Sequence, residues 1–167
     1  MLATLRYVPY GIVIGFGLLL TVQGINCLRR KLGKEPWRLL APVCFFTYLA
    51  LLVIITFFSR ELGSRADKGV DLELFSSWGI NARNNAYVIE NILLFIPYTF
   101  LYCWAYEKKR NFLSCFLLGA VTSLCIECMQ LATARGVFQI DDILTNLLGA
   151  ILGFWIFKLF GLGQKRG

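Results

Sequence analysis

Two polar stripes interrupt the apolar segments near the carboxyl end of the chain. Ser123, Glu127 and Gln130 are spaced so that they share one face of a helix. Asp142 and Asn146 repeat that spacing on the next apolar segment. A carboxylate inside such a segment costs on the order of 2–3 kcal/mol on membrane-insertion scales, so it must be neutral, paired or hydrated. These side chains are therefore candidates for binding polar groups or for general acid–base chemistry.

Four more polar side chains could complete a site with these stripes: Arg60, Glu90, Asn91 and Arg135. The guanidinium groups of Arg60 and Arg135 would hold anionic groups, while the amide side chains would supply neutral hydrogen bonds. Each residue also has an ordinary explanation when it is taken alone. Arg60 could snorkel to lipid head groups, and Asn91 or Asp142 could simply cap a helix.

The segments that must position these residues are long and apolar. The chain of 167 residues is 57% apolar and only 16% charged. Five windows reach the ~20 residues that a helix needs to cross a bilayer: Val8–Leu28, Leu39–Phe58, Tyr87–Tyr106, Phe112–Ala134 and Ile143–Leu162. A helix satisfies its own backbone polar groups in lipid. The sequence therefore predicts an all-α polytopic membrane protein, a bundle of five transmembrane helices that forms a single domain over residues 1–167.

Two of the predicted helices carry residues that shape helix packing. Gly149 and Gly153 form a GxxxG pair, which lets a neighbouring helix approach closely. Pro97 removes a backbone donor, so the carbonyl of Leu93 should lose its partner and the third helix should bend.

The net charge of +7 comes from basic residues that gather in alternate connections. They concentrate after the first window (RRKLGK), after the third (KKR) and at the carboxyl end (QKRG). The positive-inside rule places these connections in the cytoplasm, so the amino terminus would lie outside and the carboxyl terminus in the cytoplasm. Because topology explains the basic charge, we expect no nucleic-acid partner.

This orientation would bring most of the polar candidates into the outer half of the bundle. They come from four of the predicted helices and the adjoining loops: Arg60, Glu90, Asn91, Ser123, Glu127, Gln130, Arg135, Asp142 and Asn146. A structural polar network accounts for one or two such residues. A larger set on one side favours a solvated pocket that opens to the outer leaflet.

We expect neither a cofactor nor a metal ion. The chain has no histidine and six cysteines, which lie in or at the ends of apolar segments. Cys125 and Cys128 form a C-x-x-C pair inside a predicted helix, but the sequence offers no second pair. Small apolar side chains for packing are the simpler interpretation of these cysteines.

Residues 59–85 form the one long connection. Its second half contains Leu72, Leu74, Phe75 and Trp78, which could lie in the membrane interface. Loops of this length in small compact proteins are often functional. The sequence leaves open whether this one is a short interfacial helix or a re-entrant loop.

Three of these segments together resemble the VanZ-like family. The matching residues are Glu90–Pro97 (ENILLFIP), the Ser123, Glu127 and Gln130 stripe, and Asp142–Asn146 (DILTN) followed by Gly149 and Gly153. The resemblance covers roughly residues 55–157. It implies a multi-pass protein of the bacterial cytoplasmic membrane that is linked to resistance against teicoplanin-type lipoglycopeptide antibiotics.

Two functions fit this pattern. The favoured one is binding, in the outward pocket, of a membrane lipid, a lipidated drug or a lipid-linked cell-wall precursor. The other is a membrane enzyme that modifies an envelope lipid, with Glu127 as general acid or base and Asp142 ionised nearby. No motif in the sequence names a reaction. A transporter fits less well because inverted repeats are lacking, and the sequence leaves open a structural role with partner proteins and the oligomeric state.

Overall fold

The computed structural model describes residues 24, 25, 27–33, 40–58, 60, 62, 63, 69–76, 78, 79 and 82–159. Most of the first predicted span, Val8–Leu28, lies outside the described residues, and so do residues 160–162 at the end of the last one. The elements in chain order are α3 (Leu40–Val53), η1 (Ile54–Phe58), β1 (Val70–Asp71), α4 (Ala82–Ala105), η2 (Glu107–Lys109), α5 (Phe112–Ala132), β2 (Phe138–Gln139) and α6 (Ile140–Leu159).

Among the described residues, four helices are long and apolar enough to cross a membrane: Leu40–Phe58, Asn84–Ala105, Phe112–Ala132 and Ile140–Leu159. They confirm the second to fifth predicted spans as helices of a multi-pass membrane protein. The last helix begins at Ile140, earlier than the sequence suggests, so Asp141 and Asp142 lie in its first turn. Carboxylates are favourable there because the first turn carries the positive end of the helix dipole.

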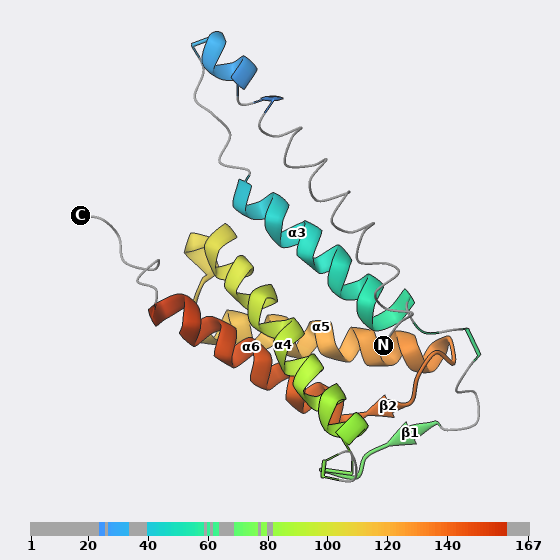
Figure 1. Cartoon of the computed structure of the whole chain (residues 1–167). Helices are drawn as coiled ribbons and strands as arrows, with labels where there is room; N and C mark the ends of the chain where they lie inside the picture. The colour runs from blue at the N-terminus through green and yellow to red at the C-terminus, as the bar shows by residue number, and fades with distance from the viewer. Residues whose placement is uncertain are drawn as a thin grey trace.

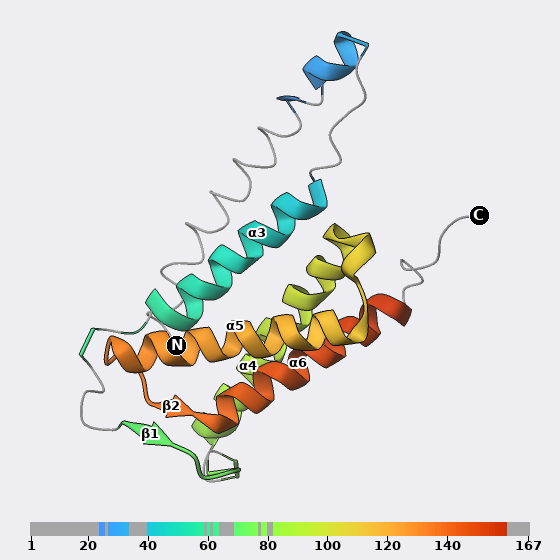
Figure 2. The ribbon, with the colours of Figure 1, turned by 180° about the vertical axis from the view of Figure 1, so that it is seen from behind.

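The helices α4 and α6 lie side by side along the bundle, with α5 against α6 and α3 against α4 (Figures 1 and 2). Gly149 and Gly153 permit the closest of these approaches. A Cβ atom at Gly149 would collide with the carbonyl oxygen of Ile92, and one at Gly153 with the carbonyl oxygen of Ile96. The GxxxG pair therefore lets α6 press directly on the backbone of α4, as its spacing predicts.

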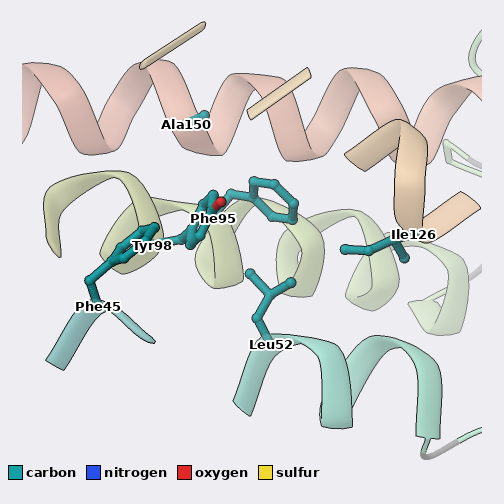
Figure 3. Packing of buried hydrophobic residues seen from close by; sticks show 6 residues of the cluster. All are labelled: Phe45, Leu52, Phe95, Tyr98, Ile126 and Ala150. Carbon is teal, nitrogen blue, oxygen red and sulfur yellow. The ribbon is translucent and has the colours of Figure 1, made fainter. Parts of the chain in front are cut away.

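All four helices contribute to one buried apolar cluster (Figure 3). Phe45 of α3 stacks on Tyr98 of α4, with ring centres 5.4 Å apart. The Tyr98 hydroxyl lies 2.8 Å from the hydroxyl of Thr122 on α5, so its polar end is hydrogen-bonded. The other members of the cluster are Leu52, Phe95, Ile126 and Ala150.

The helix α4 continues through Pro97 to Ala105. The Tyr48 hydroxyl of α3 donates to the carbonyl oxygen of Leu94 at 2.9 Å. This carbonyl is the neighbour of the Leu93 carbonyl, which loses its usual partner because proline has no N–H. Tyr48 thus ties α3 to the part of α4 that the proline disturbs.

The described part of the long loop forms a strand, which the sequence did not predict. Strand β1 pairs in parallel with β2, with Val70 opposite Phe138 and Asp71 opposite Gln139. The two strands lie beyond the end of the bundle at which α4 and α6 begin and α5 ends (Figure 1). The all-α prediction therefore needs one correction, a two-stranded ribbon that covers this end.

Candidate functional site

The hinge between α5 and α6 brings the two polar stripes together. The helix α5 ends at Ala132, and Ala134 adopts a left-handed backbone with φ of +50°. This turn is closed by a hydrogen bond of 2.9 Å from the Arg135 N–H to the Gln130 carbonyl, in the manner of a helix C-cap. After β2 the chain enters α6, so the end of α5 lies beside the start of α6.

Glu127 and Asp142 are the carboxylates at the centre of the site, and each accepts a hydrogen bond from a neutral group. The backbone N–H of Gln139 donates to Glu127 Oε2 at 3.0 Å. The Asn91 amide donates to Asp142 Oδ1 at 2.9 Å and lies 3.4 Å from the Thr145 hydroxyl. Glu127 is almost fully buried, whereas Asp142 is partly exposed. The pair therefore joins α4, α5, β2 and α6 at one point.

Arg60 supplies the positive charge that acts on both carboxylates. Its Nη1 atom donates to Gln130 Oε1 at 3.0 Å, and Gln130 Nε2 donates to the Thr56 carbonyl at 2.9 Å. Thr56 lies in the π-helical turn η1, a wide turn of a kind that often occurs at functional sites. A Cβ atom at Gly136 would lie 2.6 Å from Arg60 Nη1, so a larger residue there would require this guanidinium to shift.

Arg135 positions Arg60 instead of pointing at the carboxylates. Its Nη1 atom donates to the Arg60 carbonyl at 2.6 Å. Its guanidinium carbon lies 4.9 Å from the ring centre of Phe57 and 5.7 Å from that of Phe58, within the range of a cation–π interaction. Arg135 thus fastens η1 and the residue Arg60 after it to the hinge.

Ser123 and Asn146 join the two helices one turn deeper in the bundle. The Asn146 amide nitrogen donates to the Ser123 hydroxyl at 2.9 Å. Asn146 is only 4% exposed, and its Oδ1 atom is buried with no partner among the residues that the structure describes. Such an unpaired acceptor is rare in folded proteins and calls for an explanation.

The loop that contains β1 is fastened over the site by carboxylates. The Phe75 N–H donates to Asp141 Oδ1 at 2.7 Å, and Phe75 has a left-handed φ of +62°. Asp71 accepts from the Glu73 N–H at 3.0 Å and from the Ser76 hydroxyl at 3.1 Å. The hydrogen bond from the Glu73 N–H is the main reason that the pKa of Asp71 lies below its ordinary value. The described residues around β1 are therefore hydrogen-bonded to one another and to the start of α6.

The loop also presents apolar side chains to the outside. Leu72, Leu74, Phe75 and Trp78 are all exposed, and the Phe75 and Trp78 rings pack edge to face at 5.4 Å. Their position at the end of the spans fits the sequence-based expectation of a membrane-interface segment, which stays a prediction.

The structure thus gathers most of the predicted site residues and separates one. The residues of the cluster are Arg60, Asn91, Ser123, Glu127, Gln130, Arg135, Asp142 and Asn146. The Glu90 side chain instead lies on the exposed surface of α4. The roles of Asp71, Gln139 and Thr145 were not predicted from the sequence. The spacing of Asp71 and Glu73 is typical of a turn in which aspartate accepts a nearby N–H, and it is the one signal in the sequence for these residues.

The residues of the site cluster include no cysteine and no metal-ligand set. Among the residues that the structure describes, no group of three His, Cys, Asp or Glu side chains lies close enough to hold a metal ion. Cys125 and Cys128 are exposed on α5, apart from the site. The site can instead accept hydrogen bonds through its carboxylates, or move a proton between a carboxyl group and a bound molecule.

Comparison with known proteins identifies the family. The family model described as VanZ/LLP1 matches residues 45–161. The chain is similar to Protein VanZ of Enterococcus faecium, with 30% identity over 124 residues, which cover 71% of this chain and 72% of that protein. No solved structure matches. The match contains every residue of the site cluster, and the chain belongs to the VanZ/LLP1 family.

Proposed function

We propose that this protein contributes to resistance against teicoplanin-type lipoglycopeptide antibiotics. It would do so in the bacterial cytoplasmic membrane by binding a lipid, the lipidated drug or a lipid-linked cell-wall precursor at the Glu127–Asp142 site. Family membership and the similarity to Protein VanZ support the link to resistance. Binding is the function that the geometry of the site supports best.

The observation that carries the proposal is the meeting of Glu127 and Asp142 with Asn91 and Arg60 at one end of the bundle. A buried polar network that serves packing alone is usually satisfied internally. Here Asp142 stays partly exposed and the Asn146 Oδ1 atom has no partner among the described residues. These features are typical of a site that is completed by a ligand.

The proposed orientation follows from the basic residues. Lys108 and Lys109 follow α4, and Lys158 lies in the last turn of α6. The site lies at the opposite ends of the same two helices. If the basic end is cytoplasmic, as the positive-inside rule predicts, the site faces outward, where the drug and the cell-wall precursor are both found.

Expression in a teicoplanin-sensitive bacterium tests this function. The wild-type chain should raise the minimum inhibitory concentration of teicoplanin, and Glu127→Gln and Asp142→Asn should abolish the increase. Glu90→Gln is the matched control, because this carboxylate lies on the exposed surface of α4 at the same end of the bundle. Membrane levels of all variants are compared by immunoblotting. Full resistance with both site variants at normal levels would refute the proposal.

A membrane enzyme is the second candidate, and one observation favours it. Glu127 and Asp142 interact electrostatically, yet each has its own neutral donor, Gln139 N–H and Asn91 respectively. Two carboxyl groups in different environments can divide the roles of general acid and general base. Purified protein would then turn over a labelled envelope lipid, and Glu127→Gln would abolish turnover. Unchanged lipids across a panel of envelope classes would exclude this candidate.

A further inference from the structure

Both arginines of the site are already engaged by protein groups. Arg60 donates to Gln130, and Arg135 donates to the Arg60 carbonyl while its guanidinium packs on the Phe57 ring. The Arg135 Nε atom has no partner among the described residues, but it belongs to the guanidinium on which Phe57 packs. The described hydrogen bonds use one Nη atom of each guanidinium and hold both groups against the protein.

With respect to the residues that the structure describes, the acceptors of the site are incompletely used. Within the described part of the chain, hydrogen bonds reach only Oε2 of Glu127 and Oδ1 of Asp142. A carboxylate oxygen can accept two hydrogen bonds, so both groups have spare capacity. Asn146 adds a third acceptor, because its buried Oδ1 atom has no partner there.

These three acceptors lie within about one helical turn of each other. Glu127 follows Ser123 by four residues on α5, and Asn146 follows Asp142 by four residues on α6. Residues with this spacing lie on the same face of a helix, about 5–6 Å apart at Cβ. The hydrogen bond between Ser123 and Asn146 shows that these two faces meet. The carboxylates one turn above must therefore face each other, as their electrostatic interaction indicates.

Among the residues that the structure describes, the carboxylates of the site outnumber its arginines. Arg60 acts on both Glu127 and Asp142, and Asp141 adds a further carboxylate beside Asp142. Excess negative charge in a poorly hydrated place is unfavourable unless a cation or a proton compensates it. A phosphate would increase the imbalance, whereas an ammonium group would reduce it and supply N–H donors to the unused acceptors.

We propose that the ligand group recognised between Glu127, Asp142 and Asn146 is a primary ammonium. This inference rests on the proposed binding function and names the chemistry of its ligand. The ammonium can belong to the head group of a membrane lipid or to an amine of a soluble molecule. The site lies at one end of the spans, a position that both a lipid head group and a soluble amine could reach.

Lipid binding to the purified full-length protein in detergent micelles tests the proposal. The probes are phosphatidylethanolamine, phosphatidylcholine and phosphatidylglycerol with identical acyl chains, and native mass spectrometry reports their affinities. The ethanolamine lipid should bind about tenfold more tightly than the choline lipid, which has the same charge but no N–H donor. Glycerophosphoethanolamine, which has no acyl chains, is added as a competitor. If this competitor displaces the lipid, the amine is recognised without acyl chains. If it does not displace the lipid, the acyl chains are needed and the ligand is a lipid amine.

Variants separate a ligand contact from a structural role. Asp142→Asn should lower the affinity for the ethanolamine lipid about tenfold, and Glu90→Gln should leave it unchanged. Asn146→Asp retains an acceptor and should keep or increase that affinity, while Asn146→Leu should reduce it. Thermal unfolding of each variant verifies that it is folded.

Two results would overturn the inference, and they differ in what they say about the proposed function. Equal or tighter binding of phosphatidylglycerol that still depends on Asp142 would refute the ammonium but leave a binding site. The absence of any lipid or soluble amine whose binding depends on Asp142 would refute both.

Discussion

Asn91 on α4 and Asp142 on α6 are joined by a hydrogen bond of 2.9 Å, although they are 51 residues apart in the chain. This bond links the start of α6 to α4, the helix on which α6 packs most closely, through the Asp142 carboxylate. Thr145, one turn along α6, lies 3.4 Å from the same amide. The Asn91 side chain therefore connects the packing of α4 on α6 with the geometry of the candidate site.

Replacement of Asn91 by leucine should destabilise the protein and impair the site. The variant leaves Asp142 without its neutral donor, and the loss of a partner by a partly buried acceptor typically costs about 1–3 kcal/mol. We expect a lower melting temperature in detergent and reduced teicoplanin resistance in cells. Glu90→Gln, at the neighbouring exposed position, should change neither. A fully stable and fully resistant Asn91→Leu variant would show that this bond is dispensable.

Gly153→Ala should weaken the packing between α4 and α6. The added methyl group would meet the Ile96 carbonyl, a backbone atom that moves only if α4 shifts. Overpacking of this kind usually costs about 1–3 kcal/mol. Gly24→Ala is a suitable control, because a Cβ atom there would meet no described residue within 4 Å. Equal melting temperatures of the two variants would contradict this close helix contact.

Ala134→Gly should stabilise the hinge between α5 and α6. Ala134 has a φ of +50°, a conformation that costs an L-residue about 1–2 kcal/mol and costs glycine little. Part of this gain is lost because glycine is more flexible in the unfolded chain, so a rise of about 1 kcal/mol is expected. Ala120→Gly, inside α5, should instead destabilise by about 1 kcal/mol. Chemical denaturation of the two variants provides the comparison.

The loop over the site should loosen in acid because of Asp71. Its pKa is lower in the folded protein, mainly because the Glu73 N–H donates to the carboxylate. The carboxylate therefore stabilises the loop above about pH 3.9, the ordinary value for aspartate, and this contribution is lost as the pH falls through the lowered pKa. Trp78 fluorescence, with the other tryptophans replaced by phenylalanine, would report the change. Asp71→Asn should remove this acid transition; its persistence would assign the transition to another group.

Much of the architecture could be predicted because it depends on local signals. Continuous apolar runs predict the four described spans, and the GxxxG pair predicts the close approach of α6. The polar stripes could be placed on helices because Ser123 and Glu127, and likewise Asp142 and Asn146, are four residues apart, which is the spacing of one helix face.

The details that assemble the site could not be predicted, because they depend on backbone groups and distant partners. The donor to Glu127 is the backbone N–H of Gln139, and the partner of Arg135 is the Arg60 carbonyl. No side-chain pattern identifies such contacts. Strands of two residues are also too short to show the alternation that reveals a strand.

The most direct test of the account is the identity of the molecules that co-purify with the protein. Wild type, Asp142→Asn and Glu90→Gln are extracted from the same bacterial membranes, and bound amphiphiles are identified and quantified by mass spectrometry. If the site binds a ligand, one amphiphile should be enriched with wild type and Glu90→Gln and depleted with Asp142→Asn. The same amphiphiles in equal amounts with all three proteins would contradict a binding site at Glu127 and Asp142.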